Sequence, residues 1–442
     1  MSDEGRRIAP LARPDIHRIT SAQVVPDMRA VVKELVENAL DAGATSIEVR
    51  FREWGADGIE VIDNGSGVSR ENYEFLALKH HTSKLSAYED LGSVATFGFR
   101  GEALASLCSV ASVSVLTATE RDVPMGTVLQ LDHHGHLVSS DKRVARQRGT
   151  TVTVTDIMSN FPVRRRELEK NIKREYAKAH AALQAYALIS QGVRWASSVT
   201  QAGTKKGTQL VVRSASGPQY MRTNAAALFG ARAASQLQKI ELDLVVDDHD
   251  ADGTELRLRL RGLISHPSPG CGRSAGDRQY FYMNGRPWDS TKLASMFNQV
   301  YRTYNASQYP CVIVDLEVAK DAYDVNVSPD KRTIFLHYEA RILSRFHDAV
   351  EEHFAPARGL LAVNGPHLDR PVTVPRASPT GGSPGVSLLP TTPRKRTRED
   401  SAAGDDDEGV VPTAEDGGAA ATWLATPRRD GVDLNPHRVL VA

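Results

Sequence analysis

Three polar side chains that could act as a base or as oxygen ligands recur at helical spacing near the start of the chain. Glu34, Asn38 and Asp41 stand at positions i, i+4 and i+7, so a helix would place them on one face. The alternative is a solvated acidic face, because polar stripes opposite apolar ones are usual on surface helices. The spacing alone does not decide between a reactive site and an ordinary surface.

Two further segments could bring a carboxylate and backbone groups to the same place. Asp63 ends an expected strand at residues 58–63 and opens the turn DNGSG, which requires the conformational freedom of glycine. The segment GFRGEAL at residues 98–104 contains a second pair of glycines. A single motif of this length is more often a turn than a site, so each motif needs support from the others.

The elements that must hold these residues follow from the apolar periodicity. Residues 28–40 predict a helix, and Gly43 stands where a C-cap glycine would lie. The apolar face of this helix carries Met28, Val31, Val32, Leu35, Val36 and Ala39. Alternating apolar residues at 47–51 predict the next strand. A long helix at residues 167–190 is expected to close the first region.

A second region follows, with its own apolar content. It is expected to contain three strands and a helix, at residues 256–264, 279–283, 311–318 and 293–304. After about residue 359 the chain is rich in Pro, Ser, Thr and Gly, and such a composition buries too little apolar surface to fold. The predicted fold class is α+β, with domains at residues 1–218 and 219–358 and a disordered tail at 359–442.

Composition narrows the class of protein. Of the 442 residues, 41% are hydrophobic and 24% are charged, and a formal net charge of +0 means that any nucleic-acid surface must be a local patch. Cys108, Cys271 and Cys311 lie far apart without zinc-ligand spacing, so reduced structural thiols are expected. No segment approaches the roughly 18 apolar residues of a membrane span, and no signal peptide is evident. No membrane partner is therefore expected.

The segment KELVENALDAG at residues 33–43 resembles the first motif of the GHKL ATPases, the superfamily of gyrase B, Hsp90, histidine kinases and MutL. DNGSG at 63–67 looks like the second motif, GFRGEAL at 98–104 like the third and GTT at 149–151 like the fourth. Four motifs in the right order make coincidence implausible. The resemblance implies a Bergerat-type α/β sandwich that binds ATP and Mg²⁺.

The resemblance also implies a role for each motif. Glu34 is the candidate general base for the water that attacks the γ-phosphate, and Asn38 is the candidate Mg²⁺ ligand. Asp63 would accept a hydrogen bond from the adenine amine, and Thr151 would add a hydroxyl contact. The other candidate nucleotide contacts lie in the motifs and in the ATP lid, and they are Asp41, Gly65, Gly67, Thr82, Ser83, Lys84, Gly98, Phe99, Arg100, Gly101 and Glu102.

Within this superfamily the chain resembles MutL, in the post-meiotic-segregation branch of the eukaryotic homologues, over about residues 8–355. The resemblance rests on LKHHTSK at 78–84, on GFRGEAL and on DVNVSPDKR at 324–332, a block without an equivalent in Hsp90 or histidine kinases. It implies that the second region is a ribosomal-protein-like transducer domain. It also implies that Lys331 reaches the γ-phosphate as a compact positive charge and shares the catalytic role.

A basic segment lies between residues 164 and 178, where seven basic residues outnumber three acidic ones. Such an excess suits binding to a phosphate backbone without sequence preference, and a helix surface with internal ion pairs is an equal alternative. The basic residues are Arg164, Arg165, Arg166, Lys170, Lys173, Arg174 and Lys178. The resemblance favours double-stranded DNA as the partner of this segment.

The resemblance implies protein partners as well. They are a second MutL-type homologue, with which ATP would close a heterodimer around DNA, and a MutS-type complex that recognises mismatches. Arg394, Lys395 and Arg396 could form a nuclear import signal, so the nucleus is the expected location. The leading hypothesis is a slow ATPase of DNA mismatch repair.

Other classes of protein stay open. One is a non-enzymatic DNA-binding scaffold that uses ATP only as a conformational ligand, against which the glutamate at position 34 argues. Another is an Hsp90-like chaperone, which the block at 324–332 opposes. Members of this MutL branch also carry an endonuclease domain with a DQHAxxExxxxE-like motif, and nothing in this sequence resembles it. The chain is therefore expected to be an N-terminal portion, a truncated product or an incomplete gene model without a nuclease site.

Overall fold

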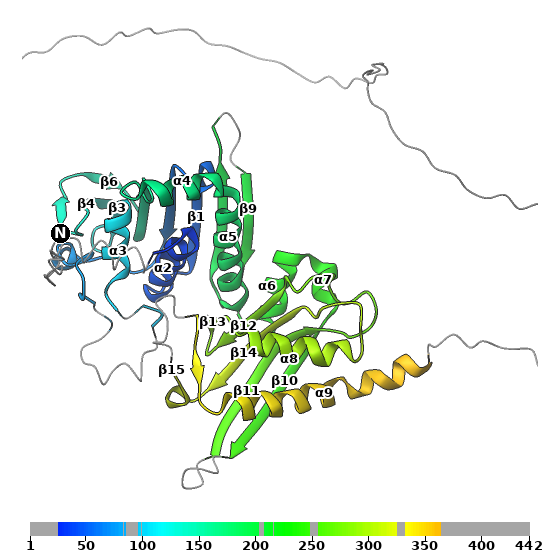
Figure 1. The fold of residues 1–442 in the computed structure, drawn as a ribbon. Coiled ribbons are helices and arrows are strands. Elements are labelled where there is room, and N and C mark those ends of the chain that lie inside the picture. Colours follow the sequence, from blue (N-terminus) through cyan, green and yellow to red (C-terminus); the bar gives the residue numbers. More distant parts are fainter. Residues whose placement is uncertain are drawn as a thin grey trace, which may run out of the picture. The chain divides into compact units, whose positions relative to one another are not determined.

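The computed structural model describes residues 25–82, 84, 96–98, 100–202, 207–214, 216–247, 255–324 and 332–363. These residues belong to one compact unit, Met1–Leu368, which is built on two large sheets with their helices (Figure 1). The α+β class predicted from the sequence is confirmed. The predicted site residues Ser83, Phe99 and Lys331 and the basic segment at 394–396 lie outside the described residues.

The first sheet has nine strands in the order β5-β4-β3-β7-β2-β1-β8-β9, with β6 paired to β4. The strands are β1 (Ser46–Arg52), β2 (Gly58–Asp63), β3 (Ser112–Ala118), β4 (Met125–Leu131), β5 (Leu137–Ser139), β6 (Arg143–Ala145), β7 (Gly149–Thr155), β8 (Arg194–Thr200) and β9 (Gly207–Arg213). Ile47, Val49 and Phe51 are buried in alternation along β1, as their spacing predicts. One face of this part of the sheet therefore carries the apolar core.

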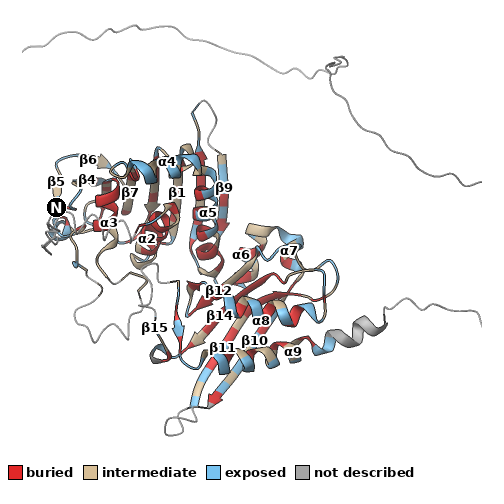
Figure 2. Ribbon diagram, viewed as in Figure 1, coloured by how far each residue is buried: buried red, intermediate tan, exposed pale blue. Residues whose placement is uncertain are grey.

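Three helices share the core of the first sheet (Figure 1), and they are α2 (Met28–Asp41), α3 (Ala103–Val110) and α5 (Ile172–Ile189). Helix α2 starts where the side chain of Asp27 accepts a hydrogen bond from the amide of Ala30, and Gly43 follows its end with a φ of +69°. The predicted helix and its C-cap glycine are confirmed. Figure 2 shows that α2 is buried along most of its length.

The prediction of one long helix at residues 167–190 is wrong in one respect. The structure has two helices, α4 (Pro162–Lys170) and α5, separated at Asn171, whose φ and ψ are −109° and 19°. The Asn171 side chain donates to the carbonyl of Glu167 at 3.1 Å, so it stabilises the break. No residue of α4 is fully buried, although Leu168 packs against the core, whereas α5 has many buried residues.

The second sheet has the strand order β10-β11-β14-β12-β13. Its strands are β10 (Leu237–Asp247), β11 (Glu255–Ser265), β12 (Gln279–Met283), β13 (Arg286–Trp288) and β14 (Val312–Val318). The three strands and the helix predicted for this region are confirmed, the helix as α8 (Thr291–Arg302). The predicted boundary at residue 218 falls between β9 and α6 (Tyr220–Phe229), and the division into domains at that point stays a prediction.

The helices of this region pack in two groups. Helix α8 and the described part of α9 (Glu339–Val363) share one core cluster with strand residues such as Ile240 and Leu260. Helix α6, which α7 (Ala231–Ser235) follows, shares another cluster with Leu263 and Ile313. The short pair β15 (Tyr323–Asp324) and β16 (Phe335–Leu336) completes the described strands. No helix among the described residues is long and apolar enough to cross a membrane.

Candidate functional site

The polar face of α2 borders a cavity of about 1200 Å³. Glu34 is only 8% exposed and Asp63, which ends β2, is also 8% exposed. The alternative of a solvated acidic face is therefore wrong for Glu34. The predicted site residues that line this cavity are Glu34, Asn38, Asp41, Asp63, Gly67, Thr82, Lys84, Gly98, Arg100, Gly101 and Glu102.

Apolar side chains accompany these polar groups. Leu35 and Ala39 of α2 and Val61, Val115 and Val152 of the sheet line the same cavity as Asp63. A cavity with an apolar wall and a few convergent polar groups suits a ligand that has a flat apolar part and a charged part. The site can therefore hold a nucleotide-sized molecule.

Asp63 presents an acceptor to the cavity. Its Oδ1 atom accepts hydrogen bonds from the backbone amides of Gly65 at 2.8 Å and Thr150 at 3.1 Å. Burial raises the pKa of the Asp63 carboxyl, while the two amides and nearby Arg146 oppose this shift. Gly65 does not line the cavity, but a Cβ atom there would lie 2.8 Å from the Ala42 carbonyl oxygen, so glycine is needed. Among the described residues, no hydrogen-bond donor reaches the second oxygen of Asp63.

Thr151, the predicted hydroxyl contact, does not line the cavity, whereas its neighbour Thr150 does. Side chains alternate along β7, and this alternation brings Thr150 and Val152 to the cavity, whereas Thr151 does not line it. The Thr150 Oγ1 atom lies 3.2 Å from the Oγ1 atom of Thr117 on β3. Thr150 therefore replaces Thr151 as the candidate hydroxyl, and only the register of the strand reveals this.

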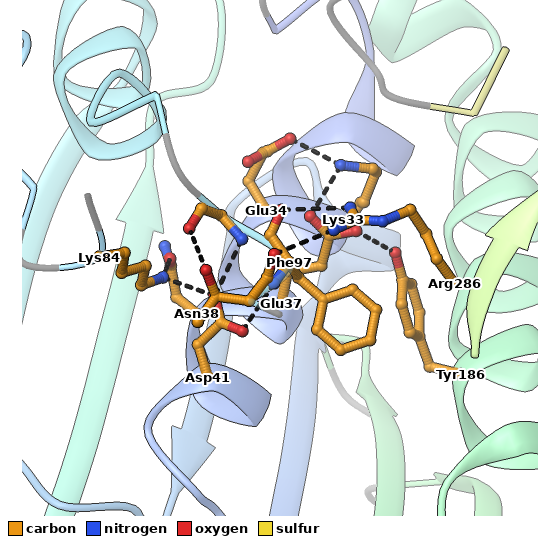
Figure 3. A network of polar contacts seen from close by, with 11 residues as sticks. Lys33, Glu34, Glu37, Asn38, Asp41, Lys84, Phe97, Tyr186 and Arg286 are labelled. Atoms are coloured by element: carbon orange, nitrogen blue, oxygen red, sulfur yellow. Dashed lines mark hydrogen bonds and ion pairs between the residues drawn. The ribbon is translucent and has the colours of Figure 1, made fainter. Parts of the chain in front are cut away.

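Glu34 belongs to a buried network of charges on α2 (Figure 3). The Lys33 ammonium lies 2.7 Å from Glu34 Oε1 and 3.0 Å from Glu37 Oε2, and Lys33 is only 3% exposed. The hydroxyl of Tyr186 on α5 donates to Glu37 Oε1 at 2.5 Å. Burial by itself would lower the pKa of Lys33, but the carboxylates of Glu37 and Glu34 outweigh it and raise this pKa.

Asp41 connects α2 to the glycine-rich loop. Its Oδ1 atom accepts from the amide of Phe97 at 2.8 Å, and its Oδ2 atom accepts from the amide of Gly98 at 2.9 Å. The Lys84 ammonium lies 2.6 Å from Asp41 Oδ2 and 3.1 Å from Asn38 Oδ1. The Asn38 amide oxygen, which is predicted to bind Mg²⁺, thus already contacts a positively charged group. Amide and carboxylate oxygens are the donors that a hard cation prefers.

The loop that contains Gly101 needs glycine at that position. Gly101 has a φ of +62°, and a Cβ atom there would lie 2.6 Å from the carbonyl oxygen of His81. The amide of His80 donates to the carbonyl of Gly101 at 3.0 Å, which ties these two loop segments together. Within the described ranges, no group of three His, Cys, Asp or Glu could hold a metal ion.

Sequence reasoning missed three further residues at this site. Lys33 and Tyr186 complete the buried network, and Arg286 of β13 donates to two backbone carbonyls just before Gly98. The i to i+4 spacing of Lys33 and Glu37 is a signal that could have indicated an ion pair. Tyr186 and Arg286 lie far from α2 in the sequence, so only the fold brings them to the site.

The basic segment predicted at residues 164–178 lies on α4 and the first part of α5. Arg165 is half-buried, and the other six basic residues are exposed. Arg165 pairs with Glu169 at 2.9 Å and Lys178 pairs with Glu175 at 2.7 Å, so the ion pairs of the alternative interpretation are present. A role in DNA binding stays a prediction.

Comparisons with known proteins agree with each other. Residues 27–159 match the family described as histidine kinase-, DNA gyrase B- and HSP90-like ATPase, and residues 225–355 match the family described as DNA mismatch repair protein, C-terminal domain. A solved structure described as the N terminal domain of a DNA repair protein is 40% identical with a TM-score of 0.69, and the match covers 79% of this chain and 100% of that one.

Two relatives show the same similarity. DNA mismatch repair protein PMS1 of Arabidopsis thaliana is 43% identical over 357 residues, which are 81% of this chain and 37% of that protein. Mismatch repair endonuclease PMS2 of Homo sapiens is 42% identical over 350 residues, which are 78% of this chain and 40% of that protein. The chain thus spans well under half the length of these relatives.

Proposed function

Because the chain belongs to the MutL/PMS family of DNA mismatch repair proteins and carries a GHKL-type ATPase domain, we propose that it binds ATP and hydrolyses it slowly. The observation that supports this proposal most strongly is the convergence of Glu34, Asn38, Asp41 and Asp63 on one cavity. The same cavity includes the glycine loop that a phosphate chain requires.

In this proposal the adenine ring lies against the apolar wall, and its amine donates to the Oδ2 atom of Asp63. The phosphates extend toward the amides of the loop that includes Gly98 and Gly101. Glu34 orients a water molecule and accepts its proton as the water attacks the γ-phosphate in line. Asn38 would hold Mg²⁺, which when bound would neutralise charge on the phosphates.

Lys331 is proposed to add a positive charge at the γ-phosphate. Its neighbour in sequence, Arg332, contacts Asp289 Oδ1 at 2.5 Å, and Asp289 Oδ2 accepts from Arg29 in the first turn of α2 at 2.9 Å. This bridge supports the proposal, because it ties the end of the block at 324–332 to the helix that carries Glu34.

An assay of the purified chain with ATP and Mg²⁺ tests the proposed function. We expect phosphate release with a rate constant below about 1 s⁻¹, at the slow end of enzyme turnover, and its loss when the metal is chelated. The alternative function, a scaffold that uses ATP as a conformational ligand, predicts binding without any turnover. Failure to bind a fluorescent ATP analogue would contradict both.

Replacing Asp63 by asparagine should weaken ATP binding by about tenfold to a hundredfold, the usual cost of a lost hydrogen bond to a charged group. The asparagine oxygen can still accept from the amides of Gly65 and Thr150, so its NH₂ group would face the adenine amine, donor against donor. The preference for ATP over GTP should also fall, because guanine offers a carbonyl at that position. Titration calorimetry with both nucleotides measures the two effects.

The control for this substitution is Thr151→Val, which changes the neighbouring strand residue that does not line the cavity. It should leave the affinity for ATP unchanged, whereas Thr150→Val should weaken it. An ATP affinity that is equal for Asp63→Asn and the wild type would refute the assignment of Asp63.

The wider role in repair is part of the same proposal. We propose that ATP closes this chain and a second MutL-type homologue around DNA in the nucleus, downstream of a MutS-type complex. Support comes from the similarity to PMS1 and PMS2 and from the exposed positive charges on α4 and α5. Both relatives are described as mismatch repair proteins. The partners are proposed for this chain because of its similarity to them.

If the basic segment binds DNA, replacing Arg166, Lys170 and Lys173 by glutamate should weaken binding to all duplex sequences alike. Each lost phosphate contact should also reduce the slope of log affinity against log salt by about 0.9. Fluorescence anisotropy over a salt series measures this slope. Arg257→Glu is a control for a single charge reversal, because Arg257 is exposed on β11 of the second sheet. An unchanged slope in the triple variant would leave the segment as an ordinary solvated surface.

A further inference from the structure

Arg286 binds the backbone segment just before the loop of Gly98 and Gly101, which we call the phosphate loop. Its Nη2 atom donates to the carbonyl of Thr96 at 3.0 Å, and its Nη1 atom donates to the carbonyl of Phe97 at 3.1 Å. The guanidinium carbon also lies 5.1 Å from the centre of the Phe97 ring, within the range of a cation–π contact. One side chain of the second sheet thus makes three contacts with the segment just before Gly98.

Asp41 holds the opposite side of the same segment. Its two carboxylate oxygens accept from the amides of Phe97 and Gly98, so the donors of this segment face α2 while its acceptors face Arg286. Figure 3 shows Phe97 between Asp41 and Arg286, with the ring of Tyr186 beside it. The segment is therefore held from two sides, by the carboxylate of Asp41 and by the guanidinium of Arg286.

Hydrogen bonds to a neighbouring strand hold the turn that precedes Arg286. This residue follows the two-residue turn of Asn284 and Gly285, whose φ angles of 48° and 78° fit the tight hairpin that joins β12 and β13. The Asn284 side chain bonds both backbone groups of Val318 at 2.9 and 3.0 Å, and the amide of Gly285 donates to buried Asp315 at 2.9 Å. These bonds to Val318 and Asp315 of β14 hold the turn in place. The second sheet therefore determines where Arg286 lies.

We propose that Arg286 is a positioning residue for the nucleotide site, through which the second sheet holds the phosphate loop in its binding geometry. This inference rests on the proposed ATP binding. It adds that the affinity for the phosphates, and not for the adenine ring, depends on a residue of the second sheet. By linkage, nucleotide binding must also stabilise the hairpin that carries Arg286.

Arg286→Lys tests the proposal, because lysine keeps the charge but cannot bridge two carbonyls with a planar fork. We expect its affinity for a non-hydrolysable ATP analogue to fall about tenfold, the effect of roughly one charge-assisted hydrogen bond, and its affinity for adenosine to equal that of the wild type. A merely structural defect would weaken both ligands alike. The matched control is Arg278→Lys, whose guanidinium lies 4.4 Å from the Phe229 ring in the same region, and which should bind both ligands normally.

Hydrogen exchange gives a second measurement, which compares the wild type with the same variant. In the wild type, the ATP analogue should slow amide exchange in the hairpin at residues 279–288, and Arg286→Lys should lose this response. Any one of three results would overturn the proposal. They are an ATP affinity that is equal in Arg286→Lys and the wild type, an equal loss of affinity for ATP and adenosine, and amide exchange in the hairpin that does not change with nucleotide. A wild type that binds no ATP would instead overturn the proposed function.

Discussion

Replacing Glu34 by glutamine is expected to lower the rate constant for ATP turnover by about a hundredfold or more, the usual contribution of a general base. The amide cannot take a proton from the attacking water, but it fills the same volume and can still accept from the Lys33 ammonium at the position of Oε1. Binding of a non-hydrolysable ATP analogue should therefore persist. Single-turnover phosphate release and equilibrium binding, measured on the same preparation, separate the two effects.

The neighbouring carboxylate supplies the control. Glu37 contacts the same Lys33 ammonium as Glu34, yet it does not line the cavity, and its Oε1 atom accepts from Tyr186. Glu37→Gln should thus reduce turnover far less than Glu34→Gln. If Glu34→Gln turns over ATP as fast as the wild type, or if Glu37→Gln is the slower variant, Glu34 is not the base.

The elements that carry the site could be predicted because local rules determine them. The apolar stripe of α2, its C-cap at Gly43 and the alternation along β1 each depend on residues a few positions apart. The motifs also indicated that Asp63 and the glycines belong to one site. The depth of burial could not be predicted, since spacing cannot tell a face that borders a cavity from one that borders solvent.

The contacts between distant segments could not be predicted in the same way. Thr150 rather than Thr151 faces the cavity because of the register of β7 in the sheet, and one residue of error inverts the face. Tyr186 and Arg286 reach the site because α5 and the β12–β13 hairpin happen to end beside it. Such placements follow from tertiary packing, and a single sequence holds no local signal for them.

Lys33→Met should destabilise the fold by about 3 to 5 kcal/mol, the usual cost of removing one partner from a buried ion pair. Methionine fills nearly the same space, so the loss reflects charge more than packing. Without the ammonium, the carboxylates of Glu34 and Glu37 repel each other with little solvent to screen their charges. Urea denaturation followed by circular dichroism measures the change in the free energy of unfolding. The exposed pair of Arg165 and Glu169 is the comparison, and Arg165→Met should cost at most about 1 kcal/mol.

The pH dependence of this difference follows from the raised pKa of Lys33. A lysine whose pKa is higher in the folded state stabilises the fold fully below its ordinary pKa of about 10.4. That stabilisation is lost only as the pH rises through the higher folded value. The gap in unfolding free energy between the wild type and Lys33→Met should therefore stay constant from pH 7 to about pH 9.

A second substitution shows whether charge is the cause. Lys33, Glu34 and Glu37 together carry one net negative charge; Lys33→Met leaves two, and adding Glu37→Gln returns the cluster to one. The double variant should therefore be more stable than Lys33→Met alone, although Glu37→Gln by itself removes a partner from both Lys33 and Tyr186 and should destabilise the wild type. If Glu37→Gln changes the free energy of unfolding in opposite directions in the two backgrounds, Lys33 and Glu37 are directly coupled. If Glu37→Gln destabilises both backgrounds equally, Lys33 contributes through packing and the buried charges act independently.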